Sequence, residues 1–86
     1  MNKEKNSFKT TKTLYDHGIE YDIKKLPKML QELIEELEEY DKVGDWLNYD
    51  LKFEILEVQA KSYLRHNGID EKDFNILMRK YGWYIW

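Results

Sequence analysis

The side chains that could do chemistry in this sequence are concentrated in one short acidic segment. Five glutamates fall within residues 32–39, at spacings of one, three and four residues. At about 100° per residue, a helix would place them opposite its apolar side. A general acid needs burial to shift its pKa, and this face is expected in solvent. The pattern therefore favours a charged binding surface over a catalytic centre; the glutamates are Glu32, Glu35, Glu36, Glu38 and Glu39.

The acidic charge continues beyond these glutamates and is strongly local. Residues 31–50 carry eight acids, including Asp41, Asp45 and Asp50, against the single base Lys42, whereas residues 1–12 carry four lysines and one glutamate. Helices that only need solubility gain from Glu–Lys pairs three or four residues apart, and residues 32–40 contain no lysine. A solvated helix face is the alternative interpretation. A patch complementary to a basic protein surface is the functional one.

Tryptophan and tyrosine form the second notable group, with seven of them in the last 41 residues. They could fill the core of a small domain, or they could act as interface anchors, a role in which Trp and Tyr are enriched. The partner-binding candidates that follow from the two groups are Glu32, Glu35, Glu36, Glu39, Asp41, Trp46, Tyr49 and Trp86.

The sequence offers little for catalysis, metals or cofactors. It has no cysteine, which excludes thiolate sites and disulfides. His17 and His66 lie in separate predicted loops, and the four glycines stand at turn positions rather than in a phosphate-binding loop. We expect no metal, no cofactor and no enzymatic activity.

A nucleic-acid interface has one feature in its favour and two against it. Residues 57–81 have the outline of a helix-turn-helix with a glycine in the turn. The second helix would open with Glu71 and Asp73, and the net charge of −3 is unfavourable beside phosphates. Direct DNA binding is therefore the weakest of the alternatives.

Apolar periodicity predicts three principal helices, over about 26–40, 46–66 and 70–81. Pro27 suits a first turn, Asp45 and Asp70 are good N-caps, and Gly44, Gly68 and Gly82 suit helix ends. The helix over 46–66 carries two apolar arcs, which predicts a central helix sandwiched between neighbours. The expected core comprises Leu30, Leu33, Leu37, Leu51, Phe53, Ile55, Leu56, Val58, Phe74, Leu77 and Met78.

The segment 13–25 has two interpretations. It could form a small β-hairpin, with a turn at Asp16–Gly18 and strand alternation at Ile19, Tyr21 and Ile23, or it could be irregular chain packed across the helices. The aromatic tail 83–86 could pair with such a hairpin, and its deletion is then expected to unfold the domain. Residues 1–12 are predicted to be a flexible basic arm, and residues 13–86 a single mainly α-helical domain.

No apolar run approaches the length of a membrane span, and the simplest location is the cytoplasm. Lysine far exceeds arginine, which fits a bacterial or phage genome of high A/T content. The function that we expect is that of a small acidic inhibitor or neutraliser, of the immunity, antitoxin or phage anti-defence type. It would occlude the basic surface of a partner protein, such as a nucleic-acid-binding enzyme. The alternative is a structural or regulatory module that forms a homodimer.

Overall fold

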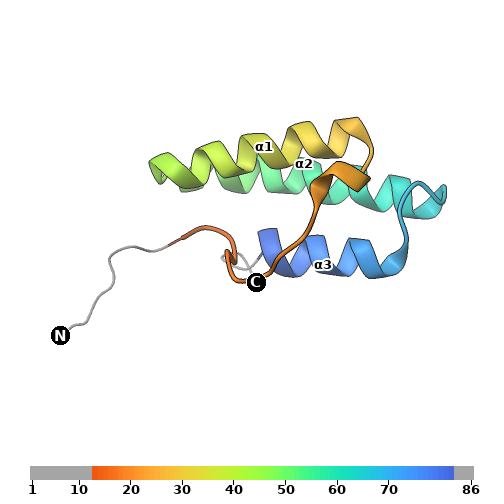
Figure 1. The fold of residues 1–86 in the computed structure, drawn as a ribbon. Helices are drawn as coiled ribbons and strands as arrows, with labels where there is room; N and C mark the ends of the chain where they lie inside the picture. Colours follow the sequence, from red (N-terminus) through yellow and green to blue (C-terminus); the bar gives the residue numbers. More distant parts are fainter. Residues whose placement is uncertain (1–12, 83–86) are drawn as a thin grey trace.

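The structure is a computed structural model that describes residues 13–82. It contains a short 3₁₀ helix and three α-helices, and no strand is present between residues 13 and 82. α1 and α2 form a long hairpin, and α3 runs alongside them (Figure 1). The prediction of a mainly helical fold with three principal helices is confirmed. The elements are η1 (Ile23–Lys25), α1 (Lys28–Val43), α2 (Trp46–Arg65) and α3 (Glu71–Tyr81).

Local capping explains where these helices begin and end. Gly44 ends α1 in the left-handed conformation, with a φ of 72° that a side chain would disfavour. Asp45 then begins α2 by accepting a hydrogen bond from the Asn48 N–H at 3.2 Å. Asp70 begins α3 in the same way, accepting from the Asp73 N–H at 2.8 Å. Both N-caps were predicted from the sequence.

Two details of the helix ends differ from the predictions. Pro27 is the N-cap of α1 rather than a residue of its first turn. The left-handed position after α2 belongs to Asn67, with a φ of 64°, and not to Gly68. A Cβ on Gly68 would lie 2.6 Å from Cδ1 of Tyr63, so this position requires glycine for lack of space.

The core lies between α1, α2 and α3, and is closed by residues that precede α1. Of the predicted core, six residues are buried, while Leu33 and Phe74 are partly buried and pack against it. Leu14, Leu26 and Ile69 add apolar side chains from outside the three helices. The six confirmed residues are Leu30, Leu37, Phe53, Leu56, Leu77 and Met78.

One part of the core prediction is wrong, because α2 is not sandwiched. Leu51, Ile55 and Val58 are exposed to solvent. The buried side chains of α2 all lie on the other arc of the helix, and both α1 and α3 contact α2. The two neighbouring helices therefore share one side of α2 and leave the second apolar arc uncovered.

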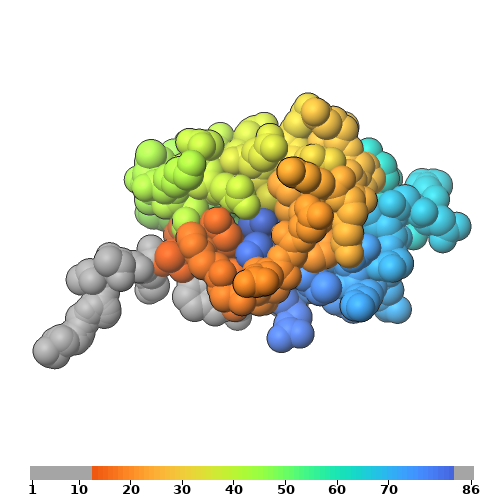
Figure 2. All heavy atoms as spheres, viewed as in Figure 1, coloured from red at the N-terminus to blue at the C-terminus, as the bar shows by residue number. Residues whose placement is uncertain are grey.

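The β-hairpin interpretation of residues 13–25 is also wrong. The predicted turn exists, since the Ile19 N–H donates to the Asp16 carbonyl at 3.3 Å. The flanking chain, however, bonds to helices instead of to itself: the Leu14 N–H donates to Asp41, and the Asp16 N–H donates to the Lys80 carbonyl at 2.8 Å. In Figures 1 and 2, residues 13–27 cross over α3 to the start of α1. The predicted arm 1–12 and the tail 83–86 lie outside the described residues.

Candidate functional site

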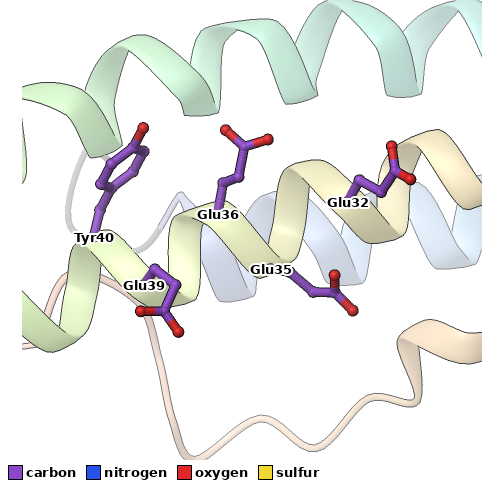
Figure 3. A pocket seen from close by; sticks show the side chains of 5 residues that line it. All are labelled: Glu32, Glu35, Glu36, Glu39 and Tyr40. Atoms are coloured by element: carbon purple, nitrogen blue, oxygen red, sulfur yellow. The ribbon is translucent and has the colours of Figure 1, made fainter.

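The strongest candidate site is an open acidic depression on α1. Glu32, Glu35, Glu36 and Glu39 are all exposed, and together with the half-buried Tyr40 they line this depression. Figure 3 shows Glu32, Glu36 and Tyr40 extending from α1 on the side where α2 lies, with Glu35 and Glu39 on its other flank. We call these four glutamates the acidic face. Helical periodicity predicted that five glutamates would share one face, and four of them do.

Two lysines partly neutralise one end of the acidic face. Lys52 of α2 contacts Glu36, with 2.8 Å between Nζ and Oε1, and this hydrogen bond raises the pKa of Lys52. Lys42 contacts Glu39 at 3.2 Å within α1. Glu32 and Glu35 form no ion pair with another residue of the described chain. The acidic face thus keeps uncompensated charge toward the start of α1.

Two acids of the same helix point away from the acidic face. Glu38 accepts a hydrogen bond from the Tyr81 hydroxyl at 3.1 Å, so it does not share the solvent side as predicted. Asp41, a candidate partner-binding residue, has a side chain that is only 8% exposed. Its carboxylate accepts from the Leu14 N–H at 2.6 Å and contacts His17 Nε2 at 3.0 Å. Asp41 anchors the segment before α1.

The aromatic candidates lie in different environments. Trp46 is 54% exposed at the start of α2, which follows the end of α1 by a short turn. Because α1 ends at Val43 and α2 begins at Trp46, Trp46 lies near the end of α1 that carries Glu39 and Tyr40. Tyr49 is fully buried, which corrects its assignment to a contact surface. Trp86 lies outside the described residues.

Tyr49 belongs to a cluster of three tyrosines, in which Tyr49 and Tyr81 are buried and Tyr15 is partly buried. Its hydroxyl donates to the Tyr81 carbonyl at 2.6 Å, and the Tyr15 and Tyr81 rings lie 5.0 Å apart. Burial, followed by the nearby charges of Glu38 and Asp41, raises the pKa of Tyr15 to about 12. Burial also raises the pKa values of Tyr49 and Tyr81. The three tyrosines are therefore neutral at ordinary pH, and their role is structural.

Lys80 is the charged neighbour of this cluster and was not recognised in the sequence as a buried residue. Its Nζ donates to the carbonyls of Asp16 and Ile19, the former at 3.3 Å. It also lies 5.3 Å from the centre of the Tyr15 ring and 5.5 Å from that of Tyr81. Periodicity gives no signal for such a residue, because the carbonyl groups that accept its hydrogen bonds are more than 60 positions away in the chain.

A second surface, on α2, is apolar, and it includes the three exposed residues that were predicted to lie in the core, Leu51, Ile55 and Val58. Its four apolar side chains on α2 are between 45% and 63% exposed, and we call them the outer face of α2. A shallow groove on this side is lined by Leu51, Glu54, Ile55, Val58 and Gln59. The two apolar arcs of α2 are the sequence feature that could have indicated this surface, because α1 and α3 together cover only one of them. The outer face comprises Leu47, Leu51, Ile55 and Val58.

Among residues 13–82, no group of three His, Asp or Glu side chains is placed to hold a metal ion. Within the same range, none of the helices combines the length and apolar character needed to cross a membrane.

Comparison with known proteins gives no relative. No protein-family model, no curated protein and no solved structure matches the chain.

Proposed function

We propose that this protein is a small, non-enzymatic binding protein of the cytoplasm that neutralises a partner by covering a basic surface on it. The observation that carries the proposal is the acidic face of α1. Four exposed glutamates share one open depression, and two of them, Glu32 and Glu35, form no ion pair with another residue of the described chain. Immunity proteins, antitoxins and phage anti-defence proteins are the functional classes that act in this way.

The acidic face would act first on the rate of association. A cluster of like charges raises the local concentration of an oppositely charged partner, and charged patches can accelerate encounter by one to three orders of magnitude. The spacing of the glutamates along one helix also resembles a row of phosphates. A nucleic-acid-binding enzyme therefore has the surface chemistry that fits this face.

Trp46 and Tyr40 would supply the apolar part of the contact. Both lie toward the end of the α1–α2 hairpin, where the acidic face terminates at Glu39. Tryptophan and tyrosine combine a large apolar area with a polar group, and they are common energetic centres of interfaces. Asp41 and Tyr49 are engaged inside the fold, so they would support the surface rather than touch the partner.

The test uses matched charge reversals on the full chain. Glu32→Lys/Glu35→Lys alters the uncompensated part of the acidic face, and Glu20→Lys/Glu71→Lys changes the net charge equally at exposed positions elsewhere. Each variant is used to capture proteins from a cell extract, and the captured proteins are identified by mass spectrometry. We expect a basic protein that is retained by the wild type and by the Glu20/Glu71 variant, and lost by the Glu32/Glu35 variant.

Binding kinetics with the captured protein complete the test. The association rate of the Glu32/Glu35 variant should be lower than that of the wild type. The wild-type rate should decrease as salt rises from about 50 to about 300 mM, because the screening length shortens. Equal association rates for all three chains would show that the acidic face plays no part in recognition.

A further inference from the structure

We infer that the outer face of α2 is a homodimer interface, in which two α2 helices pair in antiparallel orientation. The inference is independent of the proposed function, since the four apolar side chains concerned lie on α2 and the acidic face lies on α1. It rests on two observations, an uncovered apolar stripe and the distribution of charge along its edges, and the second of these selects a register.

The apolar stripe has the geometry of a helix-packing seam. Leu47, Leu51, Ile55 and Val58 are separated by four, four and three residues. At about 100° per residue they occupy an arc of roughly 80°, directly opposite the buried arc of α2. The stripe is about 17 Å long at a rise of about 1.5 Å per residue. Spacings of three and four residues are those of helices that pair side by side.

The charges beside the stripe indicate what covers it. Along one edge of α2, the first half is acidic, with Asp50, Glu54 and Glu57, and the second half is basic, with Lys61 and Arg65. In an antiparallel pair of identical helices, each edge lies against the same edge of the other copy. The acidic half of one helix then meets the basic half of the second. A second copy of this chain is therefore electrostatically complementary to the outer face.

The same charges select one register. When Glu54 lies opposite Lys61 of the second copy, Asp50 lies opposite Arg65 of the second copy, because both pairs have the same sum of residue numbers. Ile55 then packs near Val58 of the second copy at the centre, while Leu51 faces Ser62 of the second copy.

The competing register is electrostatically unfavourable. Sliding the helices to align Leu51 with Ile55 of the second copy would enclose more apolar side chains. It would also bring the two Glu54 side chains close to each other, and likewise the two Lys52 side chains. Like charges at such positions destabilise a helix pair. In a parallel pair, the acidic and basic halves would instead lie against the opposite edge of the second α2 helix. That edge consists of Asn48, Lys52 and Gln59 and carries a single charge, so it offers little complementarity.

The size of the stripe predicts a weak dimer. Four half-exposed apolar residues per copy provide less than the roughly 800 Å² per partner of a standard stable interface. We expect a dissociation constant on the order of micromolar. In this arrangement the two acidic faces lie on separate α1 helices and both remain accessible.

The first test measures the mass of the full chain by sedimentation between about 1 and about 500 µM, a range that brackets the expected constant. The wild type should shift from monomer to dimer. Leu51→Glu/Ile55→Glu should weaken association at least about tenfold, because it places charge in the seam. Met29→Glu, at an exposed apolar residue of α1, should leave it unchanged. A wild type that stays monomeric, or dimerisation that survives the Leu51/Ile55 substitutions, would overturn the inference.

A charge exchange tests the register. Glu54→Lys and Lys61→Glu should each weaken dimerisation by about three- to tenfold, and the double variant should regain wild-type association. Circular dichroism and thermal melting of each variant verify that the monomer is folded. Failure of the double variant to recover, with folding intact, would exclude this register.

A distance measurement tests the orientation. The chain has no cysteine, so Leu47→Cys provides a single attachment site for a spin label. In the proposed dimer the two labelled positions lie roughly 19 residues apart along the helix axis, which gives about 30 Å, whereas parallel helices would place them about 10 Å apart. The longer distance supports antiparallel pairing, and the shorter one excludes it.

Discussion

The carboxylate of Asp41 in α1 accepts a hydrogen bond from the backbone N–H of Leu14, at 2.6 Å and across 27 residues of sequence. The bond fixes the start of the described chain to the far end of α1, and Leu14 is buried as a result. An acid that appears in the sequence as part of a charged surface is therefore a structural anchor.

Removing this anchor should destabilise the domain. Asp41→Ala leaves the partly buried Leu14 N–H without its acceptor, which should cost about 1–3 kcal/mol. Asp41→Asn retains an oxygen acceptor and should cost less. Glu35→Ala, an exposed acid of the same helix, should change stability by no more than about 0.5 kcal/mol. Urea unfolding of the three variants measures these differences, and equal stabilities would exclude the anchoring role.

The tyrosine cluster predicts a loss of stability at alkaline pH. The pKa values of Tyr15, Tyr49 and Tyr81 are raised in the folded state above their ordinary value of 10.0. Their contribution is complete below pH 10, where both states are protonated. It falls as pH rises further, because the unfolded chain then releases protons more readily than the folded one.

Tyr49→Phe tests this contribution. At pH 8 the variant should lose about 1 kcal/mol, since the hydroxyl no longer donates to the Tyr81 carbonyl. Above pH 10 its unfolding free energy should fall less steeply than that of the wild type, because one titrating group has been removed. Denaturant curves at several pH values, with tyrosinate absorbance as a second signal, provide the comparison. Parallel pH profiles would contradict the assignment.

Two glycines should respond to alanine for different reasons. Gly44→Ala meets no atom within 4 Å, but it must adopt a φ of 72°, which should cost about 1–2 kcal/mol. Gly68→Ala meets the Tyr63 ring at 2.6 Å and should cost about 1–3 kcal/mol through overpacking. In a Tyr63→Ala background the penalty at Gly68 should shrink, whereas that at Gly44 should persist. Thermal melts of the single and double variants measure both effects, and a Gly68 penalty that is independent of Tyr63 would exclude the steric explanation.

Lys80 should hold the segment before α1 in place. Lys80→Met keeps an apolar stem but removes the donor to the Asp16 and Ile19 carbonyls, and we expect a loss of about 1–3 kcal/mol. Arg79→Met, at the exposed neighbouring position, is the matched control. Hydrogen exchange should show a faster Asp16 amide in the Lys80 variant alone. An unchanged exchange rate at the Asp16 amide would show that its hydrogen bond to the Lys80 carbonyl holds the segment without the Lys80 side chain.

The helices and their limits could be predicted from the sequence because their causes are local. Apolar spacing predicted the first and last residues of α1 and α3 to within three positions. Residue type and position identified Asp45 and Asp70 as N-caps. The grouping of the acidic face follows from the same helical period. Each of these features depends on residues that are only a few positions apart.

Only the tertiary structure decided which apolar and charged side chains are buried. The two arcs of α2 are similar in the sequence, yet α1 and α3 cover the arc of Phe53 and leave that of Ile55 exposed. In the sequence, Asp41 and Lys80 resemble surface charges, but the fold places backbone groups from distant parts of the chain against both side chains. The physical reason is that periodicity defines the faces of a helix, whereas burial depends on which other elements pack against each face.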